Sequence, residues 1–479
     1  MRFKDFLFIF SFIVIFVGAS LLLCIPFSIY YREPQYPFYI SALALLVSGF
    51  LLYAVSGKKT VSIKTNRERV ILITISWVIL ILAGTLPYLV SKTISSLVDV
   101  FFETVSGMTS TGSTVITNVE NFPKSILLWR SLTHWIGGLA TVIGLFTILP
   151  SLNIGGYDLF GIKEKTATKW RSMIIQVVMI YCALTFAQVL LLFLGGMNLF
   201  ESLCHSFGTV STGSFSPKND SITGYSPYLQ YTMALFMFLS GFSYVIYYLA
   251  ITGKLKKAII IEENRIYFIV VATISVLITG ILYFNVGKVF GTAFRESVFQ
   301  VVSFVSSSGY YTTNYLKWPS HILPLVYLLI FIGGSTGSAS GGIKMSRFLI
   351  LLKNLRQQFK IPALAPNSFT VKYNKKEIDE NINVSILTFI TVFGFLFVIG
   401  TISLSFFGTE LEKCVFLAIS ALSNFGHHVG LSDFPDAGKI ILSFLMILGR
   451  LEIYPLLLLF VPLFYNTPGN ITEKISERE

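Results

Sequence analysis

Four short segments of the chain each end in a glycine that stands among small or polar residues. A cation that crosses a membrane must exchange its water shell for fixed oxygen atoms. Backbone carbonyls point toward such an ion only where the chain takes unusual torsions, which glycine permits, and adjacent hydroxyls add further oxygen ligands. The residues predicted to bind the ion are Ser110, Thr111, Gly112, Ser113, Ser211, Thr212, Gly213, Ser214, Ser307, Ser308, Gly309, Tyr310, Asn424, Phe425 and Gly426.

The ion-binding interpretation rests on the fourfold repetition of the glycine-containing loop. A glycine in any one loop can simply allow a turn, and that alternative stays open for each loop taken alone. However, each loop follows a short apolar stretch and lies between two long hydrophobic runs. A helix of a dozen residues spans only about 18 Å, roughly half a membrane, so it must leave on the side where it entered. Four such loops around one axis predict a ring of carbonyls that replaces the hydration shell of a cation.

A second feature is a glycine-rich segment that interrupts a long hydrophobic helix between 323–332 and 343–352. Each glycine inside a helix costs up to ~1 kcal/mol relative to Ala, so we expect an irregular, mobile segment below the ion-binding loops. A phosphate-binding loop is excluded because Lys344 does not directly follow a glycine and no strand precedes the segment. We interpret it as a flexible gate, with a passive kink as the alternative. The predicted gate residues are Gly333, Gly334, Ser335, Thr336, Gly337, Ser338, Ala339, Ser340, Gly341 and Gly342.

Arg450 is the third feature, because it lies near the middle of an apolar helix. An Arg within a membrane is costly, which makes it a functional candidate. A pair with Glu452 within the helix is unlikely to form, since residues two apart point to nearly opposite faces. We expect Arg450 to be part of the gate, as a positive barrier in the path of the cation. A purely structural contact is the alternative.

The composition places these residues in a membrane. Of the 479 residues 54% are hydrophobic and only 13% are charged, whereas a soluble domain has about 25% charged residues. Several apolar runs approach the length of about 20 residues that spans a bilayer. The first run is too long for the core of a signal peptide and lacks a clear cleavage site. No catalytic or zinc-binding constellation is present, so an enzyme is not expected, and the four scattered Cys are interpreted as packing residues.

The basic residues predict the topology. Most of the 36 Lys and Arg residues lie near the N-terminus, between the hydrophobic units and in the C-terminal tail. The positive-inside rule makes these segments cytosolic and puts both termini inside, so the net charge of +12 does not indicate nucleic acid. Each unit begins and ends on this side, which makes the units parallel repeats.

The predicted fold is an all-α integral membrane protein with ten spanning helices and four half-helices around one pore. The short helices should aim their negative C-terminal ends at the ion. Their acidic residues are expected mainly to cap the outer N-terminal ends: Asp99, Glu103, Glu201, Glu296, Glu410 and Glu412. The expected units are a leading hairpin at 1–65, pore repeats at 66–156, 157–255, 256–360 and 361–466, and a cytosolic tail at 467–479.

Taken together, these motifs resemble the Trk/Ktr/HKT superfamily of potassium transporters, and within it the bacterial TrkH/TrkG type of membrane subunit. The resemblance covers essentially the whole chain, including the leading hairpin. Two positions depart from the family pattern: Asn314 stands where Asp is frequent, and His427-His428 follows the fourth glycine in place of a small residue. A packing or pH-sensitive role is open for the two histidines. The segments that carry the resemblance are 101–107, Trp129-Arg130-Ser131-Leu132, Trp135-Ile136-Gly137-Gly138, 333–344 and Gly449-Arg450-Leu451-Glu452.

The resemblance implies potassium uptake through a gated, channel-like pore in the bacterial inner membrane. It implies that Gly112, Gly213, Gly309 and Gly426 are the filter glycines and that the glycine-rich loop and Arg450 form the gate. It also implies a homodimer with one pore per subunit and a cytosolic nucleotide-binding partner of the TrkA type. Potassium is the expected ion, with no organic cofactor in the chain. The alternative function is a less selective or sodium- or proton-coupled cation transporter on the same scaffold.

Overall fold

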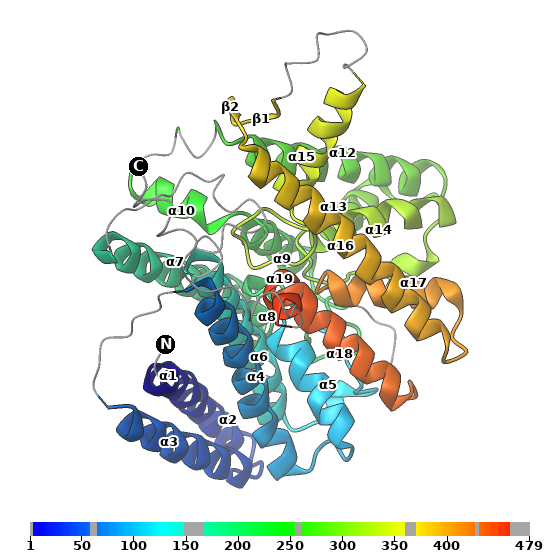
Figure 1. Ribbon diagram of the computed structural model, residues 1–479. Helices are drawn as coiled ribbons and strands as arrows, with labels where there is room; N and C mark the ends of the chain where they lie inside the picture. Colours follow the sequence, from blue (N-terminus) through cyan, green and yellow to red (C-terminus); the bar gives the residue numbers. More distant parts are fainter. Residues whose placement is uncertain are drawn as a thin grey trace, which may run out of the picture.

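The computed structural model describes residues 3–57, 65–147, 167–253, 256, 260–359, 370–426 and 431–459. Within these ranges the regular structure is helical, apart from one antiparallel hairpin. In this hairpin β1 (Lys372–Tyr373) pairs with β2 (Lys376–Glu377), with Tyr373 opposite Lys376. The all-α class predicted from the sequence is confirmed (Figure 1).

Seven helices in the described ranges are long and apolar enough to cross a membrane. Their apolar runs are those that hydropathy predicts, and Pro or capping residues define several of their starts; Thr65 and Glu68, for example, form a capping box at the start of α4. The helices are α1 (Phe3–Leu21) with its continuation α2 (Ile25–Tyr30), α3 (Tyr36–Ser56), α4 (Asn66–Ser91), α6 (Lys124–Thr147), α7 (Ala167–Leu194), α12 (Glu262–Phe284) and α16 (Glu380–Ser405).

Three further expected spans are broken in the structure. The break at the glycine-rich segment confirms the sequence prediction, whereas the sequence did not predict the breaks near Gly241 and Glu452. α9 (Pro227–Ser240) and α10 (Tyr244–Ile251) meet at 86°. α14 (Leu323–Ile332) ends at Gly333, and α15 (Met345–Gln358) resumes beyond the glycine-rich segment. α18 (Asp436–Arg450) and α19 (Tyr454–Leu458) are separated at Glu452 and Ile453, which both have positive φ. Such torsions cannot continue a right-handed helix.

Four short helices alternate with these long elements: α5 (Leu97–Met108), α8 (Leu199–Val210), α13 (Phe290–Val305) and α17 (Leu411–Leu422). Side-chain caps set the starts of two of them. Ser96 accepts a hydrogen bond from Asp99 N, and Asn198 accepts one from Glu201 N, so the first turns of α5 and α8 are satisfied. The sequence predicts a short helix of about a dozen residues before each loop, and α5, α8 and α17 have 12 residues each, whereas α13 has 16.

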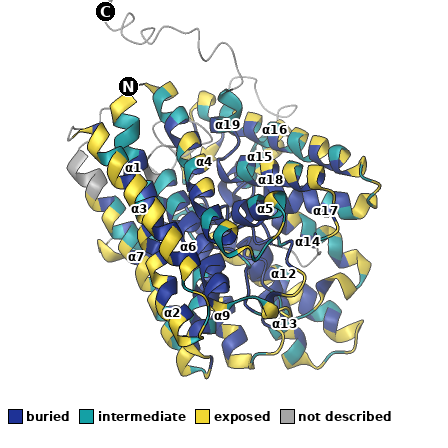
Figure 2. Ribbon diagram, turned by 90° about the horizontal axis from the view of Figure 1, so that it is seen from below, coloured by how far each residue is buried: buried dark blue, intermediate teal, exposed yellow. Residues whose placement is uncertain are grey.

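The leading pair α1 and α3 lies side by side at one edge of the molecule, next to α4 (Figure 1). Large apolar side chains on its outer face, such as Phe12 and Leu43, are exposed, as they are on α12 and α16. The interior, in contrast, holds many buried Ser and Thr residues, and Figure 2 shows buried residues gathered at the centre and exposed ones on the outer helix faces. An apolar outside around a polar inside is the arrangement that a membrane protein with a central pathway requires.

Candidate functional site

The four short helices end in one common backbone geometry. Each is followed by a capping residue and then by a residue with positive φ, which turns the chain sharply inward. The next N–H donates to a carbonyl five residues back and closes the helix end. The positive-φ residues are Ser110 (53°), Thr212 (59°), Ser307 (60°) and Asn424 (46°). The closing hydrogen bonds are Thr111 N to Ser106 O (2.9 Å), Gly213 N to Gly208 O (2.8 Å), Ser308 N to Ser303 O (3.0 Å) and Phe425 N to Ser420 O (2.9 Å).

This shared geometry corrects the sequence alignment of the second loop by one residue. Gly213 occupies the place of Thr111 in the closing hydrogen bond. The residue equivalent to Gly112, Gly309 and Gly426 is therefore Ser214. An added Cβ on Gly213 would lie 2.5 Å from the ring of His134, so this glycine faces the supporting helix α6. The sequence misplaced the register because Gly213 and Ser214 are adjacent and only one of them is a glycine.

The four equivalent residues converge. A Cβ added to Gly112 would lie 1.9 Å from Ser214 Oγ, and one added to Gly426 would lie 1.7 Å from the same oxygen. A Cβ added to Gly309 would lie 2.7 Å from the carbonyl oxygen of Gly426. Gly112 and Gly309 also have φ of +88° and +77°, so glycine is required there by both torsion and space. The ring thus brings together loops from all four short helices.

Hydroxyl groups fix the first and third loops to their own helices. Ser106 donates to Ser113 O at 2.6 Å, and Ser303 donates to Tyr310 O at 2.7 Å. Between loops, Asn424 Nδ2 donates to Thr111 Oγ1 at 3.1 Å, which ties the fourth loop to the first. The loops are therefore preorganised by the protein, and their carbonyl groups are held by bonds that need no ion.

A buried ion pair supports the first two loops from behind. Glu103 of α5 and Arg130 of α6 are 0% and 3% exposed, and Oε1 lies 2.6 Å from Arg130 Nε. Glu103 also accepts from Val115 N at 3.1 Å, and Arg130 donates to Ser216 O at 3.3 Å. The expectation that Glu103 mainly caps its helix is wrong, because this carboxylate lies beyond the first turn and is buried against Arg130.

His134, also on α6, connects the same two loops. Its Nδ1 lies 2.7 Å from Gly107 O, and its Nε2 accepts from Phe215 N at 3.1 Å. Only the tautomer with the proton on Nδ1 satisfies both bonds. The imidazole also stacks on the Phe215 ring at 4.1 Å between centroids. α6 is therefore a scaffold that fixes the first loop relative to the second.

A cavity of about 240 Å³ opens above the ring on the side of the loop connections. Gly112, Ser214 and Gly309 form its floor, and Arg130 and Tyr311 contribute to its wall. Burial raises the pKa of Tyr311 to about 12. Its hydroxyl is therefore protonated at neutral pH and donates to Asn219 O at 2.8 Å. This polar cavity leads from the surface to the converging residues.

On the opposite side of the ring, the glycine-rich segment is buried and irregular. Glu263 accepts from Thr336 N at 2.6 Å and from Ser346 N at 3.1 Å, and so clamps both ends of the segment. Ser335 N donates to Gly241 O, at the bend between α9 and α10. Its irregularity confirms the sequence expectation, and in this conformation these hydrogen bonds hold the segment in place.

Arg450 bridges this segment and the first loop. One terminal nitrogen donates to Ala339 O at 2.7 Å and the other to Ser110 Oγ at 3.1 Å. Its side chain is only 5% exposed. Glu452 pairs instead with Arg347 at 2.6 Å. The prediction that Arg450 is not paired with Glu452 is consistent with this arrangement, and both candidate gate elements meet directly beneath the loops.

The structure thus gathers the sequence-predicted loop residues around one centre and places 333–342 and Arg450 on its inner side. His427 and His428 lie outside the described residues. Sequence reasoning missed the supporting roles of Glu103, Arg130 and His134, and the clamp formed by Glu263. An Arg and a His on one apolar helix four residues apart were a usable signal, because buried polar groups require partners.

Comparison with known proteins gives concordant matches. The family model TrkH, described as a cation transport protein, matches residues 38–465. The chain is similar to the Trk system potassium uptake protein TrkH of Escherichia coli K12, with 28% identity over 474 residues, 95% of this chain and 97% of the relative. It is 29% identical over 471 residues to TrkI of Halomonas elongata, covering 95% of this chain and 94% of that protein.

The fold matches a solved structure at similar coverage. The crystal structure of the potassium transporter TrkH from Vibrio parahaemolyticus superposes with a TM-score of 0.90 at 26% sequence identity. The match covers 97% of this chain and 100% of the other. The similarity therefore extends over nearly the whole of both chains.

Proposed function

Because this chain belongs to the TrkH family of cation transport proteins, we propose that it takes up potassium ions across a bacterial inner membrane through a gated pore lined by backbone carbonyls. The relatives named as potassium uptake proteins support this ion. In this proposal the chain forms four parallel helix–loop–helix repeats around the pore, after the leading hairpin, and both termini are cytosolic.

The observation that carries the proposal is the convergence of Gly112, Ser214, Gly309 and Gly426 at the ends of four short helices. Each of these helices directs its C-terminal end, which carries partial negative charge, toward the centre. Carbonyls held in fixed positions can replace the water of a dehydrated cation. The polar cavity above the ring supplies an outer approach.

The residues on the inner side of the ring form the proposed gate. Arg450 places a positive charge beneath the loops, where it opposes a cation by Coulomb repulsion. Its bond to Ala339 O couples the charge to the glycine-rich segment. Movement of this segment would release that bond and let Arg450 leave the path. We therefore assign the closed gate to 333–342 and Arg450 acting together.

Uptake in living cells tests the function directly. Expression of the chain in a bacterial strain that lacks its own potassium uptake systems should restore growth at low external potassium and accumulation of the ion. The matched negative control is the Gly309→Ser variant, expressed at the same level in the membrane. Failure of the parent chain to restore accumulation, despite its presence in the membrane with a suitable TrkA-type partner, would overturn the proposed uptake.

Ser214 favours a second candidate, a less selective or sodium- or proton-coupled cation transporter. Its hydroxyl stands between Gly112 and Gly426, where the other loops have glycine. An additional oxygen changes the number and spacing of ligands, on which the preference among cations depends. We expect Ser214→Gly to raise the ratio of potassium to sodium flux several-fold. An unchanged ratio would remove Ser214 from ion discrimination.

Two assembly properties belong to the same proposal. We assign the chain to a homodimer with one pore per subunit, and to a complex with a cytosolic nucleotide-binding subunit of the TrkA type. The support is the membership of relatives in Trk systems and the basic residues expected on the cytosolic side. Cross-linking of the purified chain, alone and with a TrkA-type ring, tests both.

A further inference from the structure

A deep apolar cavity separates the leading helix α1 from the first group of long helices. Its volume is about 510 Å³, within the range of about 300–1,000 Å³ usual for small-molecule sites. Of the residues that line it, all are apolar or glycine except Ser76. Phe12 and Phe16 of α1 line it and are also 53% and 42% exposed, so the cavity lies next to the outer, lipid-facing surface.

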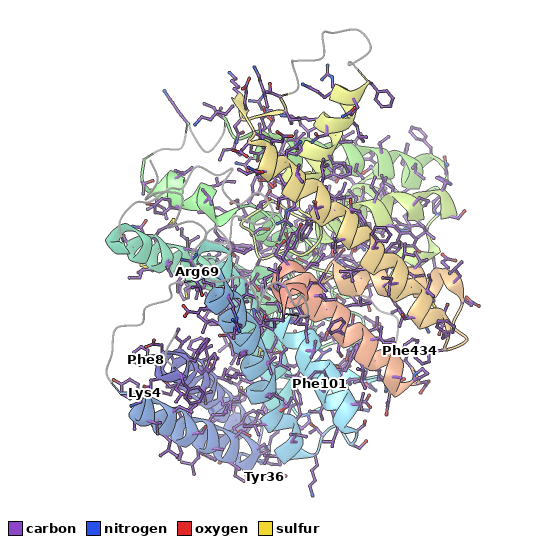
Figure 3. All side chains as sticks on the ribbon, viewed as in Figure 1. Lys4, Phe8, Tyr36, Arg69, Phe101 and Phe434 are labelled. Carbon is purple, nitrogen blue, oxygen red and sulfur yellow. The ribbon has the colours of Figure 1, made fainter. Side chains whose placement is uncertain are left out.

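The depth of the cavity in the membrane follows from its lining residues. These residues extend as far as Phe16 in the span formed by α1 and α2 and as far as Leu80 in α4, and they include the C-terminal half of α6 and Val178 of α7. Figure 3 labels Phe8 and Arg69, which lie near the N-terminal ends of α1 and α4, the two helices that frame the opening. Under the positive-inside topology, these ends all lie toward the cytosol. The cavity therefore extends from the middle of the membrane toward the inner leaflet.

A second, narrow cavity continues inward from the first. Both are lined by Ile73, Trp77, Ala140 and Gly144. The inner one has a volume of only about 30 Å³, the share of one water molecule in the liquid, and it ends at Arg450. The whole space is thus wide toward the lipid and narrow at its inner end, where Thr141 and Arg450 are the polar residues of an otherwise apolar lining.

Arg450 lines this inner end, and one of its N–H donors has no hydrogen-bond partner among the described residues. Its terminal nitrogens bind Ala339 O and Ser110 Oγ, but among the described residues Nε has no hydrogen-bond partner. A buried guanidinium donor without an acceptor carries a desolvation cost, which an anionic oxygen would offset. A phosphate head group is too bulky for the inner cavity, whereas a carboxylate is small and planar.

From this taper and this charge we infer that the cavity binds a long-chain fatty acid from the inner leaflet, with its carboxylate at Arg450 and its tail between α1 and α4. The apolar lining receives the acyl chain, which exchanges one apolar environment for another, so the contact with Arg450 decides the preference for the acid. The nearby guanidinium favours the ionised carboxylate. Binding does not depend on the proposed transport function, although an anion at Arg450 would also weaken the proposed barrier to cations.

Trp77 provides a direct optical probe, because it lines both parts of the cavity. Purified protein in detergent micelles is titrated with dibromostearic acid, whose bromine atoms quench nearby indoles. We expect saturable quenching that unbrominated stearate reverses and that is lost in Trp77→Phe. Methyl dibromostearate and dibrominated phosphatidylcholine should bind at least about tenfold more weakly, since they lack the charged hydrogen bond to Arg450.

Gly144 offers a variant that closes the cavity without disturbing the fold. A Cβ added there meets no atom within 4 Å, so Gly144→Leu fits and fills the junction of the two parts. It should abolish the saturable quenching. Gly394→Leu is the matched control, because Gly394 also lies in a helix with no atom within 4 Å of an added Cβ but lines neither cavity.

Three outcomes would overturn the inference: no saturable quenching of the parent protein, equal affinity for the methyl ester, or full quenching in Gly144→Leu. The Arg450→Gln variant should lower affinity for the acid but leave the weak binding of the ester unchanged. Because the assay reads binding alone, its failure leaves the transport proposal untouched, and failure of transport leaves this site testable.

Discussion

At the scale of single residues, the glycines of the ring leave the least room for substitution. At Gly309, φ is +77° and an added Cβ would lie within 3 Å of Gly426. A side chain there must both adopt a left-handed torsion, at a cost of about 1–2 kcal/mol, and displace backbone atoms of the fourth loop. Gly112 has the same two constraints, against Ser214.

Gly112→Ser and Gly309→Ser should therefore each lower potassium uptake about tenfold or more, the factor that corresponds to about 1.4 kcal/mol, while the protein still reaches the membrane. Gly291→Ser is the matched control, because Gly291 lies in α13 with no atom within 4 Å of an added Cβ. Uptake and membrane levels are measured together in the same cells. Parental uptake and selectivity in both ring variants would exclude these glycines from the filter.

The Glu103–Arg130 pair is a second residue-scale constraint, because removal of one partner leaves the other charged and buried. Glu103→Gln should destabilise the protein by about 3–5 kcal/mol. The exposed pair Lys372–Glu377 serves as control, with a loss of about 0–1 kcal/mol expected for Glu377→Gln. Thermal unfolding in detergent measures both. Equal losses in the two variants would contradict the supporting role of the buried pair.

At the scale of elements, the interrupted helices position the proposed gate, which consists of 333–342 and Arg450. Glu263 of α12 clamps the glycine-rich segment, and Arg450 at the end of α18 bonds to its carbonyl at Ala339. Two elements far apart in sequence therefore determine the position of one short loop. Loss of either contact should shift the loop toward conformations in which the path is less obstructed.

Arg450→Ala should raise ion flux in the absence of any partner protein, because it removes both the charge and the bond to Ala339. Arg450→Lys keeps the charge and should retain the low flux. A partial deletion within 334–341 should act like Arg450→Ala. Flux is measured on variants that elute as a single species after detergent extraction. Lower flux than the parent in a well-folded Arg450→Ala or deletion variant would disprove the barrier role of that element.

Much of this element layout could be predicted from the sequence. Apolar runs and helix caps mark the long helices and α5 and α8, since hydropathy and capping are local properties. The register of the second loop could not be predicted from the sequence. Gly213 and Ser214 are neighbours, and only the hydrogen bond from Gly213 N to Gly208 O shows which of them occupies the ring. The clamp at Glu263 also escaped, because its partner Thr336 is remote in sequence.

At the scale of the whole molecule, no connection between the expected spans is long enough to fold into a nucleotide-binding domain, which usually needs about 50 residues or more. We therefore expect nucleotide control to come from a separate protein that docks on the side that the positive-inside rule makes cytosolic. We expect the purified chain to bind neither ATP nor NADH, and its flux to respond to nucleotide only after a TrkA-type ring is added. A nucleotide response of the isolated chain in liposomes would contradict this.

We propose that this chain alone forms a pathway for potassium through the ring of Gly112, Ser214, Gly309 and Gly426. Its most direct test is ion flux through the purified Arg450→Ala protein in liposomes, compared with the same protein carrying Gly309→Ser in addition. We predict potassium flux well above that of empty liposomes and a loss of flux or of potassium preference in the double variant. Flux indistinguishable from empty liposomes, or flux that Gly309→Ser leaves unchanged in rate and ion preference, would contradict the claim.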